Sequence, residues 1–315
     1  MEVTNPLVSV LMPAYKMKYL ESAIRSVLKQ TYKNFELIIV NDKSPDDIDS
    51  IVYGFKDDRI RYYINETNIG GHDPVANWNK CLGYAKGDFV CLLCDDDTYE
   101  PRFIERMVSL ADSQPETNTF RARAKVIDKD GNVKHLYSTV AKHVEYEDMM
   151  CHFLQGCLET TISEWFFRRN RMLECGGYYP APLAWFSDEL STFRFAQKGG
   201  LGYCEEILVS FRCSGENISD SGYKHAMVWL EALNVFEDEM RKLISVSKLE
   251  WQGQLLELLQ IKLTQHKLFC VSFISFFQTL NVLCHKKKYR LSNREIADII
   301  YNLPRNMFIR LKRKK

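Results

Sequence analysis

Short, mostly apolar runs alternate with segments of helical periodicity over about the first hundred residues. The runs are too short for helices, and their apolar character is typical of buried strands. Between the first two runs, Leu20, Ile24 and Val27 recur at the three- and four-residue spacing of one helix face. The alternation of strand and helix predicts a parallel α/β sheet flanked by helices. The predicted strands of this part are 8–12, 35–40, 60–64 and 89–93.

The pattern changes after about residue 100, where strands follow one another without regular helices between them. From His225 the periodicity is helical to the end, and the segment 219–222 is rich in turn-forming residues. We therefore predict two domains, an α/β domain over 1–222 and a helical region with a basic tail over 223–315. The elements predicted in the middle of the chain are a hairpin of 120–127 and 133–138, strands 163–167 and 207–212, and a helix over 188–197.

The helical region contains one long apolar stretch and an uneven charge. Residues 268–284 are apolar apart from five Ser, Gln, Thr and Asn residues, whereas a spanning helix needs about 20 mostly apolar residues. We predict a packed or interfacial helix. The net charge is +1, yet residues 285–315 alone carry +9. A basic segment beside an amphipathic helix fits an anionic membrane surface, and a solvated tail fits equally well.

Composition places the chain among globular proteins, with 46% hydrophobic and 26% charged residues. Nothing in the overall charge calls for a nucleic-acid partner. Ten cysteines at irregular spacing do not indicate a secreted disulfide scaffold, and the start of the chain lacks the apolar run of a signal peptide. We expect a cytoplasmic protein, placed by its tail at the inner face of the cell membrane if that tail binds lipid.

Three adjacent carboxylates follow the predicted strand 89–93, in the sequence Cys94-Asp95-Asp96-Asp97. In open α/β sheets ligands bind beyond the carboxyl ends of the strands. Adjacent carboxylates repel one another, and their hard oxygen atoms suit Mg²⁺ or Mn²⁺ bridged to substrate phosphates. A solvated acidic turn before a helix near Pro101 is the alternative. Cys91 and Cys94 have CxxC spacing, but they lie in a predicted core strand, and we expect no redox or zinc site there.

Asp42 follows another predicted parallel strand and should open onto the same edge of the sheet. Its carboxylate could accept hydrogen bonds from a nucleobase or ribose, or it could simply cap a turn. Tyr15, just after the first strand, could stack on a base or belong to the core.

Several segments of the chain form a pattern in order and spacing: 8–15, 26–32, 35–44 and 85–90, followed by the acidic triplet and Pro101. Over roughly residues 6–215 this pattern resembles family 2 glycosyltransferases. The resemblance implies the GT-A fold and transfer of a sugar from a nucleotide-sugar, with a UDP-sugar as first choice, and inversion at the anomeric carbon. For the acceptor we expect a glycan or lipid-linked molecule, such as a growing surface glycan on a lipid carrier, for which the basic tail is the only hint in the sequence.

The resemblance assigns roles to individual positions of the nucleotide site. Pro13, Ala14 and Tyr15 resemble the first nucleotide-binding loop, and Asp42 resembles the carboxylate that holds the base. Asp95 belongs to the DXD-like element and is expected to contact the ribose.

The metal is expected on the same element. Asp96 is the first-choice ligand, and Asp97 resembles the acid that follows it. Cys94 stands where the family's string begins with an acid, and a thiol is a poor partner for Mg²⁺. We therefore expect Cys94 not to bind the metal.

The resemblance places the catalytic base at Asp188, at the start of a predicted helix and six residues before Arg194. An inverting transfer needs a base that takes the proton of the attacking hydroxyl. The alternative role is an N-cap, which Ser187 or Asp188 could also fill.

Besides Cys94, three positions depart from the family pattern: Trp78 replaces a common Arg, Ser187 replaces the acid before the base, and Ser214 replaces a His. The departures at Cys94, Trp78 and Ser214 keep a second hypothesis open, a nucleotide-sugar-binding protein without catalysis. A third hypothesis, a sugar nucleotidyltransferase, would need a Gly-rich basic loop after the first strand. The sequence there is Met12-Pro13-Ala14-Tyr15-Lys16, which contains no glycine, so we do not favour this third hypothesis.

Overall fold

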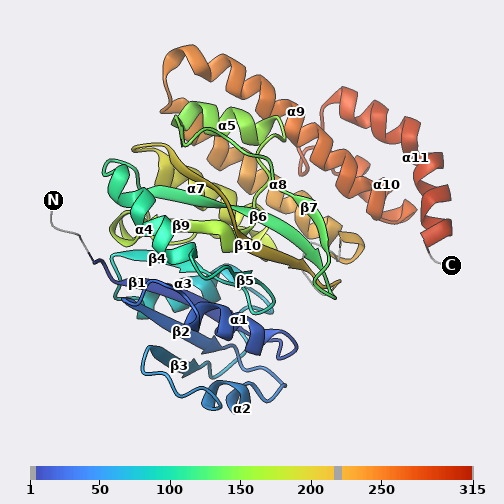
Figure 1. Cartoon of the computed structure of the whole chain (residues 1–315). Helices are drawn as coiled ribbons and strands as arrows, with labels where there is room; N and C mark the ends of the chain where they lie inside the picture. The colour runs from blue at the N-terminus through green and yellow to red at the C-terminus, as the bar shows by residue number, and fades with distance from the viewer. Residues whose placement is uncertain (1–4, 216–221, 314–315) are drawn as a thin grey trace. The chain divides into compact units, whose positions relative to one another are not determined.

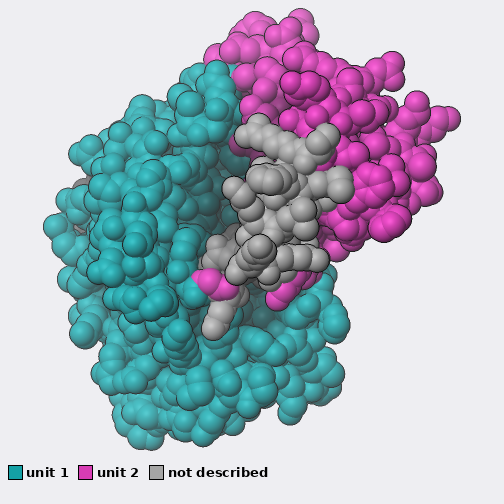
Figure 2. All heavy atoms as spheres, turned by 90° about the vertical axis from the view of Figure 1, so that its right-hand side faces the viewer, with its two compact units in different colours: residues 1–180, 187–214 teal, residues 181–186, 215–315 magenta. Residues whose placement is uncertain are grey.

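The chain forms two compact units in a computed structural model that describes residues 5–215 and 222–313, with residues 222–223 and 304–313 described by backbone alone. The first unit contains the chain up to 180 and residues 187–214; the second contains 181–186 and the chain from 215 on (Figure 2). The sequence predicted a single boundary after residue 222. The short segment Ala181–Phe186 joins the second unit because Trp185 stacks on Trp229 and Phe186 on Phe236.

One mixed sheet of ten strands is the frame of the first unit (Figure 1). Its order is β3-β2-β1-β4-β9-β6-β10-β5, with β7 beside β6 and β8 beside β10. β1 pairs in parallel with both β2 and β4, whereas β9 runs antiparallel between β4 and β6. The strands are β1 (Val8–Ala14), β2 (Phe35–Asn41), β3 (Ile60–Ile64), β4 (Phe89–Leu92), β5 (Thr98–Tyr99), β6 (Thr119–Asp128), β7 (Val133–Leu136), β8 (His143–Val144), β9 (Trp165–Arg168) and β10 (Leu201–Cys213).

Helices cover this sheet because each of them buries one apolar stripe. α1 buries Leu20, Ala23, Ile24 and Val27, which join the core with residues of α2, α4 and the central strands. α3 begins as the sequence indicates: the Asp73 side chain accepts from the Ala76 N–H, and Pro74 opens the first turn. The helices of this unit are α1 (Leu20–Leu28), α2 (Ile48–Tyr53), α3 (Pro74–Tyr84), α4 (Phe103–Ser113), α5 (Tyr146–Leu154), α6 (Arg169–Glu174) and α7 (Ser187–Ala196), with the short helix η1 (Ile162–Glu164).

The predicted strands and hairpin correspond to observed elements, and the largest difference concerns β10. The sequence predicted a strand over 207–212, but β10 begins at Leu201 and spans 13 residues. Its pairing with β6 shifts register between Cys204 and Val209. A bulge of this kind interrupts the alternation of inward and outward residues, so the first half of the strand has no strand pattern to read. The helices α5 and α6 were not predicted at all.

The second unit is helical, as predicted (Figure 1). The apolar stretch 268–284 is not one helix, however: α9 ends at Phe273 and a new helix starts at Phe276. Ser275 causes the break, since its side chain accepts from the Gln278 N–H while the Gln278 side chain accepts from the Ser275 N–H. None of the helices in the described part of the chain is both long and apolar enough to cross a bilayer. The helices of this unit are η2 (Pro182–Ala184), α8 (Gly222–Ser245), α9 (Leu249–Phe273), α10 (Phe276–Cys284) and α11 (Asn293–Arg313).

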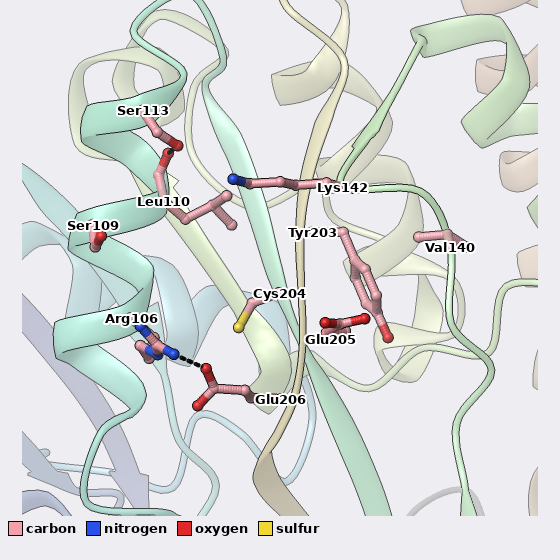
Figure 3. Close-up of a pocket in the computed structure, with 10 residues that line it drawn as sticks. All are labelled: Arg106, Ser109, Leu110, Ser113, Val140, Lys142, Tyr203, Cys204, Glu205 and Glu206. Carbon is pink, nitrogen blue, oxygen red and sulfur yellow. Dashed lines mark hydrogen bonds and ion pairs between the residues drawn. The ribbon is translucent and has the colours of Figure 1, made fainter.

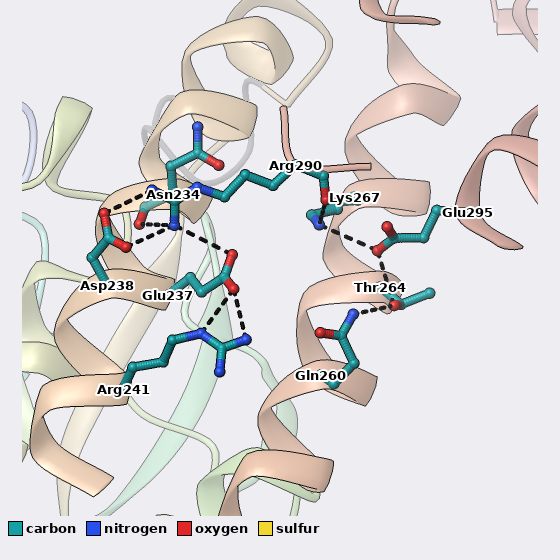
Figure 4. A network of polar contacts seen from close by, with 9 residues as sticks. All are labelled: Asn234, Glu237, Asp238, Arg241, Gln260, Thr264, Lys267, Arg290 and Glu295. Carbon is teal, nitrogen blue, oxygen red and sulfur yellow. Dashed lines mark hydrogen bonds and ion pairs between the residues drawn. The ribbon is translucent and has the colours of Figure 1, made fainter. Parts of the chain in front are cut away.

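Polar contacts fasten the segment between α10 and α11 to the longer helices (Figure 4). Lys267 of α9 lies 3.3 Å from Glu295 of α11, and both side chains are almost fully buried. The same Lys267 ammonium donates to the Arg290 carbonyl at 2.7 Å, while the Arg290 guanidinium makes two hydrogen bonds to the Asp238 carboxylate. Glu295 also accepts from the Ser292 N–H. Because Glu295 belongs to α11, removing this helix would leave the Lys267 ammonium buried without its counter-charge.

Candidate active site

The strand order reverses at β1 and β4, and the loops that follow these two parallel strands meet there. One carboxylate oxygen of Asp95 accepts from the backbone N–H groups of Tyr15 at 2.8 Å and Lys16 at 2.7 Å. A reversal of strand order leaves a crevice beyond the carboxyl ends of the strands, which is where such sheets bind nucleotides. Asp95 thus joins the two loops that the sequence assigned to nucleotide binding.

Asp96 lies next to a cationic side chain of the same crevice. The Lys16 ammonium is 3.7 Å from Asp96 Oδ2, and the Ser214 hydroxyl lies 3.4 Å from the same oxygen. Burial raises the pKa of Asp96, and the nearby Lys16 acts in the opposite direction. A carboxylate in this setting favours a positive partner, and the Lys16 ammonium provides one in this structure.

Both carboxylate oxygens of Asp97 accept hydrogen bonds from other parts of the protein. Its side chain is fully buried, and its two oxygens accept from the Ser163 hydroxyl at 2.5 Å and from the Arg212 N–H at 2.8 Å. Burial, together with the neighbouring Asp96, raises its pKa to about 8. The sequence predicted Asp97 as a second metal ligand, but in this arrangement its oxygens hold β10 and η1 against the acidic loop.

The acidic loop fits a cation that receives most of its ligands from a substrate. Within the described residues, no three His, Cys, Asp or Glu side chains are grouped to hold a metal by themselves. Mg²⁺ is often bound by one or two carboxylates plus substrate phosphates, and Asp96 beside Asp95 offers that donor set. Burial and the neighbouring carboxylates raise the pKa of the Cys94 thiol well above its usual value, and a neutral thiol is a poor ligand for such ions.

Asp42 is buried at the end of β2, where it organises the loop before α3. One of its oxygens accepts from Asn65 Nδ2 at 2.7 Å and the Ile69 N–H at 2.9 Å, and the other accepts from the Gly70 N–H at 2.6 Å. A Cβ at Gly70 would lie 2.8 Å from Asp42 Oδ2, so this approach requires glycine. Oδ1 accepts two of these hydrogen bonds and Oδ2 only one, so a base that contacts Asp42 directly would have to reach Oδ2.

The first predicted nucleotide loop is held by its backbone and leaves one ring exposed. Pro13 and Ala14 end β1, and the Ala14 carbonyl accepts from the Asp42 N–H at 2.9 Å. Tyr15 follows with its carbonyl bound to the Ser44 hydroxyl and its side chain 42% exposed. The open ring is accessible for stacking on a base, whereas the core alternative would need it buried.

Asp188 lies in the first turn of α7, where the helix dipole favours a negative charge. Its side chain is half-buried. The adjacent Glu189 accepts from the Thr160 hydroxyl at 3.2 Å, and burial together with the charge of Asp188 raises the pKa of Glu189 well above its usual value. The raised pKa means that Glu189 holds its proton more firmly than an exposed glutamate does, beside the half-buried side chain of Asp188.

A buried ion pair lies behind these carboxylates. Arg121 Nε is 2.9 Å from Glu164 Oε1, both side chains are fully buried, and the guanidinium lies over the rings of Tyr137, Trp165 and Tyr203. Burial raises the pKa of Glu164 to about 8 against the effect of Arg121, and Asp188 adds to the rise. Glu164 follows Ser163, the partner of Asp97, so the helix η1 joins the two predicted centres.

Comparison with known proteins agrees with this geometry. Residues 9–175 match the sequence model described as glycosyl transferase family 2, which is just over half of the chain. The chain belongs to glycosyl transferase family 2. The fold is that of GT-A transferases: a crystal structure of TarS from S. aureus in complex with UDP-GlcNAc aligns with a TM-score of 0.63, at 16% identity, over 95% of this chain and 91% of that one.

Curated family 2 relatives match over different lengths. The putative teichuronic acid biosynthesis glycosyltransferase TuaG of Bacillus subtilis is 28% identical over 70% of this chain and 85% of its own length. The UDP-Glc:alpha-D-GlcNAc-diphosphoundecaprenol beta-1,3-glucosyltransferase WfgD of Escherichia coli is 39% identical over 33% of this chain and 40% of its own length. The uncharacterized glycosyltransferase MJ1057 of Methanocaldococcus jannaschii is 30% identical over 48% of this chain and 55% of its own length.

The family 2 departures have structural counterparts. Trp78 packs edge-on against Tyr178, and the amide of Asn79 bonds both the N–H and the carbonyl of Tyr178. This part of α3 therefore supports the turn before α7. Ser214, which stands in the place of a family His, has its hydroxyl 3.4 Å from Asp96 Oδ2.

Sequence reasoning missed three residues of the site: Lys16, Ser163 and Arg212. Lys16 follows the predicted loop directly and could have been noted as a cation next to it. Arg212 donates from Nε to the Asp96 carbonyl at 3.0 Å; its segment resembles a family pattern of Arg-x-His with Ser214 in the place of the His, but the sequence assigned Arg212 no role. Ser163 carries no signal in the sequence, because a lone serine before a strand is common.

A cavity of about 380 Å³ lies elsewhere in the first unit, between α4, β10 and the segment before β8 (Figure 3). An ion pair between Arg106 and Glu206 crosses its wall. It contains none of the predicted site residues, and we assign it no part in the site. Its lining consists of Arg106, Ser109, Leu110, Ser113, Val140, Lys142, Tyr203, Cys204, Glu205 and Glu206.

Proposed function

We propose that this family 2 transferase moves a sugar from a nucleotide-sugar, with a UDP-sugar as first choice, to an acceptor hydroxyl with inversion at the anomeric carbon. The observation that carries the proposal is the pair of hydrogen bonds from Tyr15 and Lys16 to Asp95. They bring a nucleotide loop and an acidic loop together at the reversal of strand order, where α/β sheets bind nucleotides.

The donor half of the mechanism uses the two loops at β1 and β4. Tyr15 stacks on the base, Asp95 lies toward the ribose, and Asp42 either contacts the base or shapes the loop that does. Asp96, with Asp95 beside it, would hold Mg²⁺ or Mn²⁺, which supplies charge neutralisation for the leaving diphosphate. The Lys16 ammonium lies 3.7 Å from Asp96 Oδ2 in this structure. When a donor is bound, we propose that this ammonium pairs with the diphosphate and releases Asp96 for the metal.

The acceptor half of the mechanism centres on Asp188. Its carboxylate takes the proton of the acceptor hydroxyl as that oxygen attacks the anomeric carbon from the side opposite the leaving group. The pKa of the adjacent Glu189 is raised, and the Arg121–Glu164 ion pair is buried at the helix η1. Bond formation to the acceptor oxygen and departure of the diphosphate then require only one proton transfer to the protein.

We further infer that the acceptor is a glycan carried on a lipid, as in surface polysaccharide or glycolipid assembly. WfgD and a Campylobacter jejuni relative, 40% identical over 95 residues, are both named for diphosphoundecaprenol-linked acceptors. The basic tail supports the same proposal through its attraction to an anionic membrane.

Incubating the purified full chain with a panel of nucleotide-sugars, with and without Mn²⁺, is the direct test of this proposal. We expect hydrolysis of one donor, a UDP-sugar, that depends on the metal. Binding of a donor without hydrolysis or transfer would instead support a nucleotide-sugar-binding protein that lacks catalysis. Release of pyrophosphate from a nucleoside triphosphate and a sugar phosphate would identify a nucleotidyltransferase, and an absence of any donor binding would overturn the proposal.

The tail prediction can be tested with a truncation inside α11 that keeps the contact between Lys267 and Glu295. The side chains of 304–315, with six of the eleven cations beyond residue 284, lie outside the described part of the chain. A chain ending at Leu303 keeps Glu295 against Lys267, which a cut at 285 would not. We expect this truncation to weaken sedimentation with anionic liposomes and to leave donor hydrolysis unchanged. Equal sedimentation of the two forms would contradict a role for these cations.

A further inference from the structure

Helix α10 presents an apolar stripe outward, which is the reverse of a helix that merely packs on a soluble protein. Phe276, Phe277, Leu280 and Cys284 are exposed, and the first three are 36%, 81% and 39% exposed. At about 100° per residue these four positions lie within one face of the helix. The opposite face carries Thr279 and Val282, which are fully buried.

The end of α9 extends this apolar character. Phe269 is 46% exposed, and its ring packs edge-on against Phe273 at 4.8 Å. The rings of Phe276 and Phe277 are in contact in the same way at 5.8 Å. Three exposed phenylalanines within nine residues are unusual for a surface in contact only with water, and such apolar patches mark an interaction site.

Exposed cations follow the stripe directly. Lys286 and Lys287 are exposed, and neither forms an ion pair within the described residues. Lys288, by contrast, is paired with Glu231 at 2.7 Å. Lys286 and Lys287 lie in the turn directly after α10, and Arg290 of the same turn is held by Lys267 and Asp238 (Figure 4).

We propose that this surface, Phe276, Phe277, Leu280, Lys286 and Lys287, binds an anionic membrane, with the rings entering the acyl boundary and the ammonium groups meeting lipid headgroups. The combination decides the partner: an apolar stripe alone would suit a second protein copy, but adjacent unpaired cations complement a surface rich in anionic lipid. Because no helix of the described chain is suited to crossing a bilayer, α10 would lie in the plane of the interface. The biological reason for such a contact rests on the proposed lipid-linked acceptor. The membrane contact itself does not depend on catalysis.

Vesicle sedimentation of the full chain tests the two components of the surface separately. The double variant Phe277→Ser with Leu280→Ser is expected to lower binding at least about tenfold on vesicles of phosphatidylcholine mixed with phosphatidylglycerol. The double variant Lys286→Gln with Lys287→Gln is expected to lower it about thirtyfold on those vesicles. On vesicles of phosphatidylcholine alone, the lysine variant should bind like the unchanged protein, and high salt should remove the difference on the mixed vesicles.

Matched controls come from the same unit. Leu249 is as exposed as Phe277, at 81%, but begins α9, and Leu249→Ser should leave binding unchanged. Lys248→Gln removes an exposed charge from the same turn and serves as the control for the lysine pair. Thermal unfolding of each variant verifies that the helices remain intact.

Two results would overturn the proposal. One is vesicle binding by both double variants that equals binding by the two controls. The other is a chain that is dimeric in solution and becomes monomeric in the Phe277→Ser, Leu280→Ser variant, which would assign the stripe to a second copy. Donor hydrolysis should be the same in all these proteins, so a failed transferase assay and a failed membrane assay remain distinguishable.

Discussion

Asp188→Asn is expected to keep the fold of the chain and to lose turnover by about 10²–10⁴, the usual contribution of a positioned base. Asparagine has the same shape and caps a helix nearly as well, but it cannot accept the proton of the acceptor hydroxyl. Donor affinity should change little, because the donor is proposed to contact Tyr15, Asp95 and Asp96 instead. The measurement is kcat for transfer together with the Kd for the nucleotide-sugar.

A matched control separates catalysis from the helix dipole. Asp148 occupies the first turn of α5 in the same half-buried setting as Asp188, and Asp148→Asn removes a first-turn carboxylate without touching the site. Its turnover should be unchanged, and any loss of stability gives the dipole contribution. Near-normal turnover in a folded Asp188→Asn protein would show that Asp188 serves only the first turn of α7, and the base would have to be sought elsewhere.

Asp96→Ala is expected to abolish transfer and to weaken the metal-dependent part of UDP binding. The substitution removes the carboxylate that we propose as the metal ligand and leaves Lys16 without its nearby acid. Binding of UDP in the absence of a divalent ion should survive, since the base and ribose contacts belong to other residues. Calorimetry of UDP binding with Mn²⁺ and with chelator measures the two parts.

The control for Asp96 is an acid that lies outside the crevice. Asp130 is an exposed acid of the hairpin turn between β6 and β7, and Asp130→Ala should behave like the unchanged protein in both titrations. If Asp96→Ala binds UDP with the normal dependence on Mn²⁺, the metal is held elsewhere and the proposed donor site is wrong.

Local pattern was enough to predict the first half of the fold. The short, mostly apolar runs of β1 and β2 predict buried strands, and Asp73-Pro74 fixes the start of α3 within a residue. The pattern fails where tertiary pairing decides. β10 bulges against β6, and Ser275 divides an apolar stretch whose composition alone suggests one helix. The positions of α5 and α6 depend on packing that no local periodicity records.

The candidate site also has a part that the sequence predicts and a part that it does not. Because Tyr15, Asp42 and Asp95 each follow a predicted parallel strand, the sequence was enough to predict that they lie at the same edge of the sheet. Sequence could not show that Asp42 is occupied by a loop or that Asp97 is bound on both oxygens, because these partners lie between 23 and 115 residues away along the chain. Whether a carboxylate is available to a ligand depends on such distant donors.

The helix η1 has a consequence for how specificity can change. Ser163 anchors the acidic donor loop through Asp97, and Glu164, the very next residue, belongs to the buried pair behind Asp188. A backbone shift that accommodates a new acceptor would therefore be transmitted to the donor loop within one peptide unit. Grafting an acceptor half from another transferase onto this chain should succeed only if the junction lies before Thr161, so that both anchors are inherited together. On the donor and acceptor roles proposed above, we expect acceptor choice and donor choice to be coupled through η1 and not to be exchangeable as independent modules.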